Sequence, residues 1–352
     1  MMDFVNYTPF APMTFEGVDL NDEPFQVIIL KGSFKIVPDS ALVPVPEQHP
    51  IVETDQYFAA PYQGSVRIES EMAPFKPAAD IIINATAYPP GGKPAAQWSV
   101  SAQVGEKRKV LAVTGPRFWR HSLLEGWQIG LPEPCASVPL RYEHAYGGQW
   151  EAGKDQDVCD QNPAGVGYVD LEKISKAKPV PAPRIMSPND PVIKIGKAHN
   201  PEGFCTICRS WQPRLALAGT YDQQWQEQRH PKPPLDFKSA FYNCAHPDLI
   251  VDDYLQGDEK VELRRLHPVH ETLRFCLPGY HIIGAITDRD DYRYGAMARL
   301  DTLCLHVDEL RAFLIWRISL PLMEDGIRRL ETRFVTPQFL EQLKPLNYTP
   351  AA

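Results

Sequence analysis

Short runs in which apolar or β-branched residues alternate with polar ones recur along the first third of the chain. The clearest of them cover residues 26–37, 65–70, 80–88, 97–104 and 107–115. Alternation with a period of two places successive side chains on opposite faces of a strand, so it predicts half-buried strands here. Residues 104–107 suit a tight turn between the last two runs, and we expect a β-hairpin.

The C-terminal part repeats this pattern, with small and branched apolar residues that alternate imperfectly with polar ones. The runs cover residues 259–266, 271–277, 281–288, 292–308 and 310–320. They predict a meander of antiparallel hairpins. We therefore expect a mainly β protein in which antiparallel hairpins form a sandwich-like or barrel-like body with a few short helices.

Two segments favour a short helix. They cover residues 221–229 and 336–344. In the second, Thr336 is placed to cap the helix and Pro337 occupies the favoured first turn.

Prolines divide the chain into short segments. There are 35 of them, about twice the average usage, and their clusters leave little room for long helices. Residues 155–199 are polar, rich in Pro and Lys and weakly patterned, which is typical of a long excursion or a boundary. We expect residues 1–352 to form a single β-rich domain, or two β lobes at about 1–150 and 200–335 joined by this excursion.

Composition narrows the class of protein further. The 352 residues are 43% hydrophobic, enough for a substantial core, and the formal net charge is -8. No basic stripe stands out, which argues against a nucleic-acid partner because that binding depends on clustered Lys and Arg. No secretory signal is visible in the sequence, and the longest apolar stretches fall far short of the roughly 20 residues that span a bilayer. We expect a cytoplasmic protein without membrane insertion.

Seven cysteines are spread along the chain, an odd number that does not suggest a disulfide framework. Cys205 and Cys208 have the spacing of two zinc ligands, and Cys244 with His246 could complete a tetrahedral set. The one-residue spacing of the second pair is unusual for zinc, and buried free thiols are the favoured interpretation. No cofactor is expected, and whether Cys205 and Cys208 bind a metal stays open.

Aromatic residues, arginines and glycines are densest at residues 118–168, in the strings FWRHSLLEGW, VPLRYEHAYGG and NPAGVGY. A second block of this character covers residues 202–222. Rings beside guanidinium groups, with glycines where the backbone turns, suit a rigid recognition surface or a well-packed sheet corner. The candidate partner-binding residues are Trp119, Arg141, Tyr142, Glu143, Tyr146, Trp211, Arg214, Tyr221 and Trp225.

The motifs of common enzymes do not appear in the sequence. It has no serine elbow, no phosphate loop that ends in Lys and no HExxH metalloprotease helix, so we do not expect an enzyme. Two alternatives stay open. One is a hydrolase that uses a histidine and carboxylates near residues 141–144. The other is a small-ligand or glycan-binding module with exposed Trp119, Trp127, Trp211 or Trp225 as a stacking platform, an alternative that burial of all four rings would exclude.

Seven unusual strings occur in order between about residues 25 and 278. They are FWRHSLLEGW, VPLRYEHAYGG, NPAGVGY, GFCTICRSWQPR, GTYDQQWQEQRHPKPPLDF, FYNCAHPD and GDEKVELRRLHP. With them the chain resembles a bacterial type VI secretion accessory family, catalogued as domain of unknown function 2169. The segment CTIC departs from the family pattern, which usually has a glycine-rich run without thiols there, and this argues against a zinc site common to the family.

The resemblance implies a cytoplasmic adaptor or chaperone. Such a protein stabilises a secreted effector, often through a PAAR or PAAR-like domain, and helps to load it onto the VgrG spike. The family provides no catalytic residues to transfer onto this chain. An acidic, strand-rich body with aromatic and arginine side chains is compatible with that role, because such side chains dominate protein interfaces.

Overall fold

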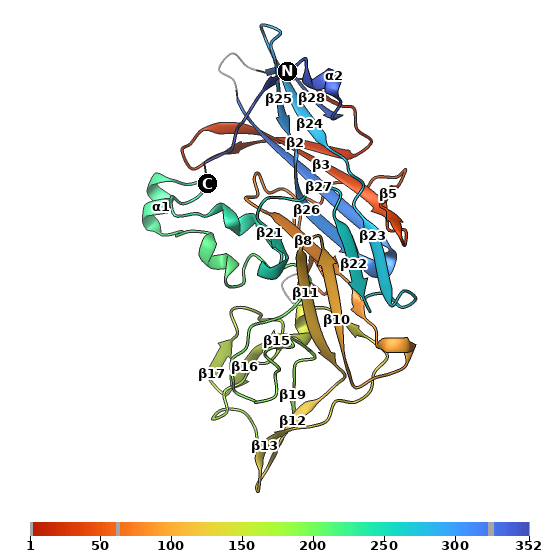
Figure 1. Cartoon of the computed structure of the whole chain (residues 1–352). Helices are drawn as coiled ribbons and strands as arrows, with labels where there is room; N and C mark the ends of the chain where they lie inside the picture. Colours follow the sequence, from red (N-terminus) through yellow and green to blue (C-terminus); the bar gives the residue numbers. More distant parts are fainter. Residues whose placement is uncertain (1–2, 61–63, 323–326, 352) are drawn as a thin grey trace.

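The computed structural model describes residues 3–60, 64–322 and 327–351, and it shows an elongated, mainly β protein (Figure 1). The mainly β prediction is confirmed. None of the sheets formed by these residues closes into a barrel, so the barrel-like alternative does not apply. No helix among them is long and apolar enough to cross a bilayer.

A seven-stranded sheet forms the centre of the molecule. Its strands, in spatial order, are β2 (Ala11–Val18), β3 (Pro24–Lys35), β27 (Arg311–Pro321), β26 (Arg299–His306), β8 (Ala79–Asn84) and β21 (Ile250–Val251), with β5 (Val43–Pro44) beside β3. β26 and β8 are parallel, whereas the other neighbours are antiparallel. β3 and β27 are buried almost throughout, because both faces of this sheet are covered.

A six-stranded sheet packs beside the central one. Its order is β20 (Ile185–Met186), β11 (Lys107–Thr114), β10 (Gln97–Val104), β22 (Lys260–Arg264), β23 (Thr272–Cys276) and β4 (Ser40–Ala41). The predicted hairpin is confirmed, since Val104 pairs with Lys107 across a two-residue turn. Gly105 has a φ of 53° in that turn, a left-handed conformation that glycine adopts at little cost.

A five-stranded sheet lies at the end of the molecule that holds the N-terminus (Figure 1). Its order is β1 (Asp3–Asn6), β28 (Ile327–Phe334), β24 (Ile282–Asp288), β25 (Arg293–Met297) and β29 (Lys344–Pro345). Only Ala298 separates β25 from β26 of the central sheet. The run 292–308 is therefore two strands in two sheets.

The expected C-terminal hairpins form, but they do not make one meander, because they belong to three sheets. The pair β22–β23 joins the six-stranded sheet, β24–β25 the five-stranded sheet and β26–β27 the central one. Each local antiparallel pair was visible in the sequence. The choice of sheet depends on which apolar face each pair buries, and this choice has no local signal.

One hydrophobic core joins the central and six-stranded sheets. It contains Phe34 and Trp316 from the first and Val100 and Leu263 from the second, all at most 1% exposed. Phe10 stacks on Trp316 with ring centroids 5.1 Å apart. Offset aromatic pairs of this kind fix the relative position of the elements that carry them.

Both predicted short helices are confirmed. They are α1 (Gln223–Gln228), capped by the Asp222 side chain, and α2 (Pro337–Leu340), capped by Thr336. Each cap satisfies a backbone N–H of the first turn that has no partner inside the helix.

Short strands build the end of the molecule farthest from the N-terminus (Figure 1). β13 (Gly126–Ile129), β12 (Phe118–Ser122) and β19 (Val180–Pro181) form a three-stranded sheet. The remaining pairs are β15 (Tyr146–Gly147) with β18 (Val166–Gly167), β16 (Gln149–Ala152) with β17 (Asp155–Val158), β14 (Val138–Pro139) with β9 (Thr86–Ala87) and β6 (Gln56–Tyr57) with β7 (Val66–Ile68). The excursion 155–199 contributes β17, β18 and β19 to this region and β20 to the six-stranded sheet.

Candidate functional site

The hairpin β12–β13 projects from the end of the molecule farthest from the N-terminus (Figure 1). Its strands pair from Trp119 with Ile129 to Ser122 with Gly126, which leaves a three-residue loop. Gly126 has a φ of 69°, the left-handed conformation that such a loop requires at this point. The Ser122 hydroxyl accepts a hydrogen bond from the Glu125 N–H at 3.0 Å, which fixes the loop.

Two adjacent leucines occupy the tip of this hairpin. Leu123 is 100% and Leu124 98% exposed, and Leu131 beyond β13 is 92% exposed. Burial of one leucine side chain stabilises a fold or a complex by about 1.5–3 kcal/mol. The tip leucines do not contribute such burial to the fold, and exposed apolar side chains at a protruding point are typical of a surface that contacts a partner.

The base of the hairpin is held rigidly by Trp119. Its ring is 1% exposed, and its indole N–H donates to the Ile193 carbonyl at 3.0 Å. Trp127 packs partly against the same cluster, with its ring 5.4 Å from that of His121. Trp119 therefore anchors the hairpin that presents the leucines.

Three further candidate residues are aromatic side chains in the interior. Tyr142 is 2% and Trp211 6% exposed, and their rings meet edge to face with centroids 5.6 Å apart. Tyr146 is 6% exposed and packs against His199. These side chains make intramolecular contacts in this structure.

Arg214 is buried as well and carries the densest set of hydrogen bonds among the candidates. Its guanidinium donates to both carboxylate oxygens of Glu69 at 2.8 and 2.9 Å. It also donates to the carbonyls of Ile207 at 2.6 Å and Phe241 at 2.7 Å. A forked guanidinium suits this arrangement, which ties three separate segments together.

Four candidate residues keep some solvent exposure. Arg141 lies over the Phe58 ring at 4.3 Å, and Glu143 accepts hydrogen bonds from the N–H and hydroxyl of Ser65. Tyr221 is 56% exposed and packs edge to face on Trp225. Direct contact with a partner stays a prediction for these four, whereas the five buried residues support the fold.

Among the described residues that line the cavity beside Arg141, no histidine is hydrogen-bonded to a carboxylate. Arg141 lines a cavity of about 330 Å³ together with His306 and Glu309. The Nδ1 of His306 lies 3.9 Å from Glu309, too far for a hydrogen bond, and Glu309 is paired with Arg67 at 2.7 Å. Burial, followed by the positive charge of Arg67, lowers the pKa of His306 to about 4.

The four tryptophans of the glycan-binding alternative do not share one exposed face. Trp119 and Trp211 are buried, and Trp127 and Trp225 are half-buried. They lie on β12, on the segment before residue 214, on β13 and on α1. Only Trp127 and Trp225 of these four rings keep enough exposure to stack on a ligand.

The thiols and His246 that could form a zinc set have separate partners. Cys205 donates to the Leu140 carbonyl at 2.8 Å, Cys208 lies 3.2 Å from the Ser210 hydroxyl, and Cys244 donates to Asp80. Burial raises the pKa of the Cys205 and Cys244 thiols. Thiols are metal ligands as thiolates, so these positions suit buried, protonated groups.

His246 belongs to a different cluster, in which Lys109 occupies the centre. Glu202, His246 and Asp248 offer ligand atoms within 4.8 Å of one another. The Lys109 ammonium lies among these atoms at 2.5, 3.2 and 2.8 Å, respectively. An internal cation thus occupies the place that a bound metal ion would take.

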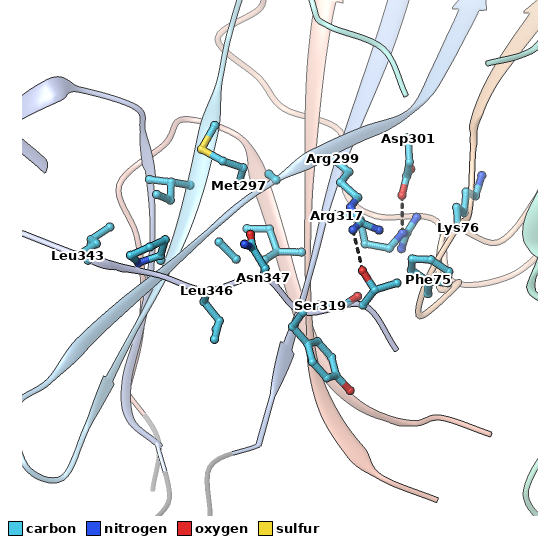
Figure 2. A pocket seen from close by; sticks show the side chains of 18 of the residues that line it. Phe75, Lys76, Met297, Arg299, Asp301, Arg317, Ser319, Leu343, Leu346 and Asn347 are labelled. Carbon is cyan, nitrogen blue, oxygen red and sulfur yellow. Dashed lines mark hydrogen bonds and ion pairs between the residues drawn. The ribbon is translucent and has the colours of Figure 1, made fainter. Parts of the chain in front are cut away.

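A larger cavity of about 830 Å³ separates the central sheet, the five-stranded sheet and the C-terminal segment. Figure 2 shows aliphatic side chains on one side of it, among them Met297, Leu343 and Leu346. Charged side chains gather at the other side, including Arg299 and Arg317. Neither a sequence motif nor residue type alone indicates this cavity.

Fold and surface together define an open, multi-sheet β protein with a projecting apolar hairpin tip. The chain belongs to the bacterial family described as "uncharacterized protein conserved in bacteria (DUF2169)", whose family model matches residues 21–317. Comparisons with curated proteins and with solved structures gave no match. Membership in domain of unknown function 2169, expected from the seven strings, is therefore confirmed, and the tip leucines lie within the matched part.

Proposed function

We propose that this chain is a cytoplasmic adaptor or chaperone that binds and stabilises a type VI secretion effector. In this proposal it engages the effector through a PAAR-like domain and helps to load it onto the VgrG spike. The sequence resemblance described above supports the biological setting. The observation that carries the proposal is the pair of fully exposed leucines, Leu123 and Leu124, on a rigidly anchored hairpin.

A protein is the partner that best fits this tip. Two leucines at the end of a narrow hairpin match a hydrophobic pocket, and apolar anchors in pockets supply most of the affinity of protein interfaces. The tip carries no cluster of Lys or Arg, and the whole chain has a formal charge of -8. Anionic lipid surfaces and nucleic acids favour the opposite charge.

The test is co-expression of the chain with the effector encoded beside it, followed by affinity purification and calorimetric titration. The double variant Leu123→Ser/Leu124→Ser should keep its melting temperature, because both side chains are already in water. Its affinity for the effector should fall by about 10²–10⁴-fold, the equivalent of about 1.5–3 kcal/mol for each buried leucine. Leu235→Ser is the matched control, since Leu235 is 74% exposed and lies outside the hairpin.

Three results would reject the proposal, its interface or its choice of partner. Failure of the unaltered chain to form a complex with the effector rejects the adaptor function. An unchanged affinity of the double variant shows that the tip is not the docking surface. Binding of the tip to vesicles of anionic lipid, tested in parallel, would show that its apolar side chains face a membrane and would overturn the choice of a protein partner.

A further inference from the structure

The 830 Å³ cavity of Figure 2 is large enough for a ligand and is walled by strands of two sheets and by the C-terminal segment. One wall comes from Ile283 of β24 and the β25 backbone, and a second from Ile318 of β27. Leu343 and Leu346 of the C-terminal segment close the outer side. Small-molecule sites commonly have volumes of about 300–1,000 Å³, so this cavity lies within that range.

The aliphatic side of the cavity offers few hydrogen-bonding side chains. Ile283, Met297, Ile318, Leu343 and Leu346 contribute hydrocarbon or thioether surface. A peptide would bring an N–H and a C=O with every residue and would leave many of them without a partner there. A plain alkyl chain has no such groups and fits this side better.

The opposite side contains one more cation than carboxylates. Lys76 pairs with Asp80 at 2.7 Å, and Arg317 pairs with Asp301 at 2.7 Å. Arg299 makes no ion pair with any carboxylate of the described residues. An uncompensated positive charge in a partly buried site is costly, so an anionic group is favoured there.

The hydrogen bonds of Arg299 and Arg317 leave room for such a group. Arg299 donates to the hydroxyls of Tyr254 at 3.1 Å and Thr349 at 3.0 Å, both neutral acceptors. Arg317 is 3% exposed, and its Nη2 has no hydrogen-bond partner. Charge-assisted hydrogen bonds from a guanidinium to a carboxylate are about twice as strong as those to a neutral oxygen.

We propose that this cavity binds an alkyl carboxylate, with the carboxylate at Arg299 and the hydrocarbon chain among Ile283, Ile318, Leu343 and Leu346. The apolar wall accounts for the chain and the excess cation for the charged end. Thr349, which already contacts Arg299, lies on the C-terminal segment, so the ligand would also hold this segment against the body. The site does not depend on the adaptor function and is testable on the chain alone.

The test uses 11-(dansylamino)undecanoic acid as a fluorescent probe, with dodecanoate and dodecanol as competitors. The unaltered chain should bind the probe saturably at one site, and dodecanoate should displace it at a concentration at least about tenfold lower than dodecanol. Arg299→Gln should weaken probe binding by about tenfold. Ala298→Phe, which fills the cavity, should abolish probe binding. If circular dichroism shows that Ala298→Phe does not fold, Leu346→Trp is used as the cavity-filling variant instead.

Leu124→Ser is the control, because Leu124 lies on the hairpin tip and away from the cavity. Unchanged probe binding in this control supports the assignment, and lost binding overturns it by placing the probe on the tip. Equal competition by dodecanol, absence of saturable binding, or binding that survives the cavity-filling variant also overturns it. Loss of the effector in Leu124→Ser with retained probe binding separates the two proposals from each other.

Discussion

Arg214 allows a sharp test of whether a candidate recognition residue serves the fold or a partner. Its side chain is 4% exposed, and its guanidinium spans Glu69, the Ile207 carbonyl and the Phe241 carbonyl. Arg214→Ala removes all of these hydrogen bonds at once. We expect it to destabilise the protein and to leave the affinity of the folded fraction for a partner unchanged.

The size of the effect follows from what the substitution leaves behind. Removal of one partner of a buried ion pair commonly costs about 3–5 kcal/mol, because a charge stays buried without compensation. Glu69 keeps an ion pair with Arg209 at 2.9 Å, so the cost should lie near the lower end, at about 3 kcal/mol. Arg214→Lys should recover only part of the loss, because an ammonium cannot fork between the carboxylate and two carbonyls.

The assay is urea denaturation followed by circular dichroism and tryptophan fluorescence. With a slope of about 3 kcal/mol per M, the midpoint of Arg214→Ala should fall by about 1 M. Arg108→Ala is the control, since Arg108 is exposed on β11 and should change the stability by no more than about 0.5 kcal/mol. An unchanged midpoint combined with lost partner binding would refute the reasoning and assign the guanidinium to the interface.

Two further predictions concern acid and thiol reagents. Burial, followed by the positive charge of Lys109, lowers the pKa of His246 to about 4, and burial also lowers the pKa of His306 to about 4. The unfolded chain therefore binds more protons between about pH 4 and 6.5, and the free energy of unfolding should fall on acidification across this window by up to about 3 kcal/mol per histidine. His246→Gln should make the urea midpoint less dependent on pH. In the native protein only the two half-buried thiols, Cys135 and Cys276, should react rapidly with 5,5′-dithiobis(2-nitrobenzoate), whereas all seven thiols should react in urea. Rapid reaction of a third thiol in the native protein would contradict the described packing.

The local elements of this fold could be predicted from the sequence, but not their arrangement in sheets. The strands at 97–104 and 107–115 were placed to within one residue because alternation and a glycine turn are local signals. The parallel pairing of β8 with β26 has no local signal. It brings Lys76 to within 3.0 Å of Thr302, 226 positions further along the chain.

Residue type alone also did not predict which of these side chains are buried and which are exposed. Trp119 and Arg214 are of residue types that are common in interfaces, yet both are buried because other segments of the chain pack over them. Leu123 and Leu124 are of a residue type that is common in cores, yet both are exposed because a three-residue loop cannot bury them. Their signal was present in the string SLLEG, in which a serine and a glycine frame two leucines between aromatic strands.

The central sheet has a consequence for how the protein is made. β3 leaves the ribosome long before its neighbour β27, because residues 36–310 lie between the two strands. At about 5–20 residues per second, the 226 positions between Lys76 and Thr302 take tens of seconds to translate. During that time the edge of β3 that pairs with β27 and the edge of β8 that pairs with β26 have no partner, so the nascent chain passes through an aggregation-prone interval.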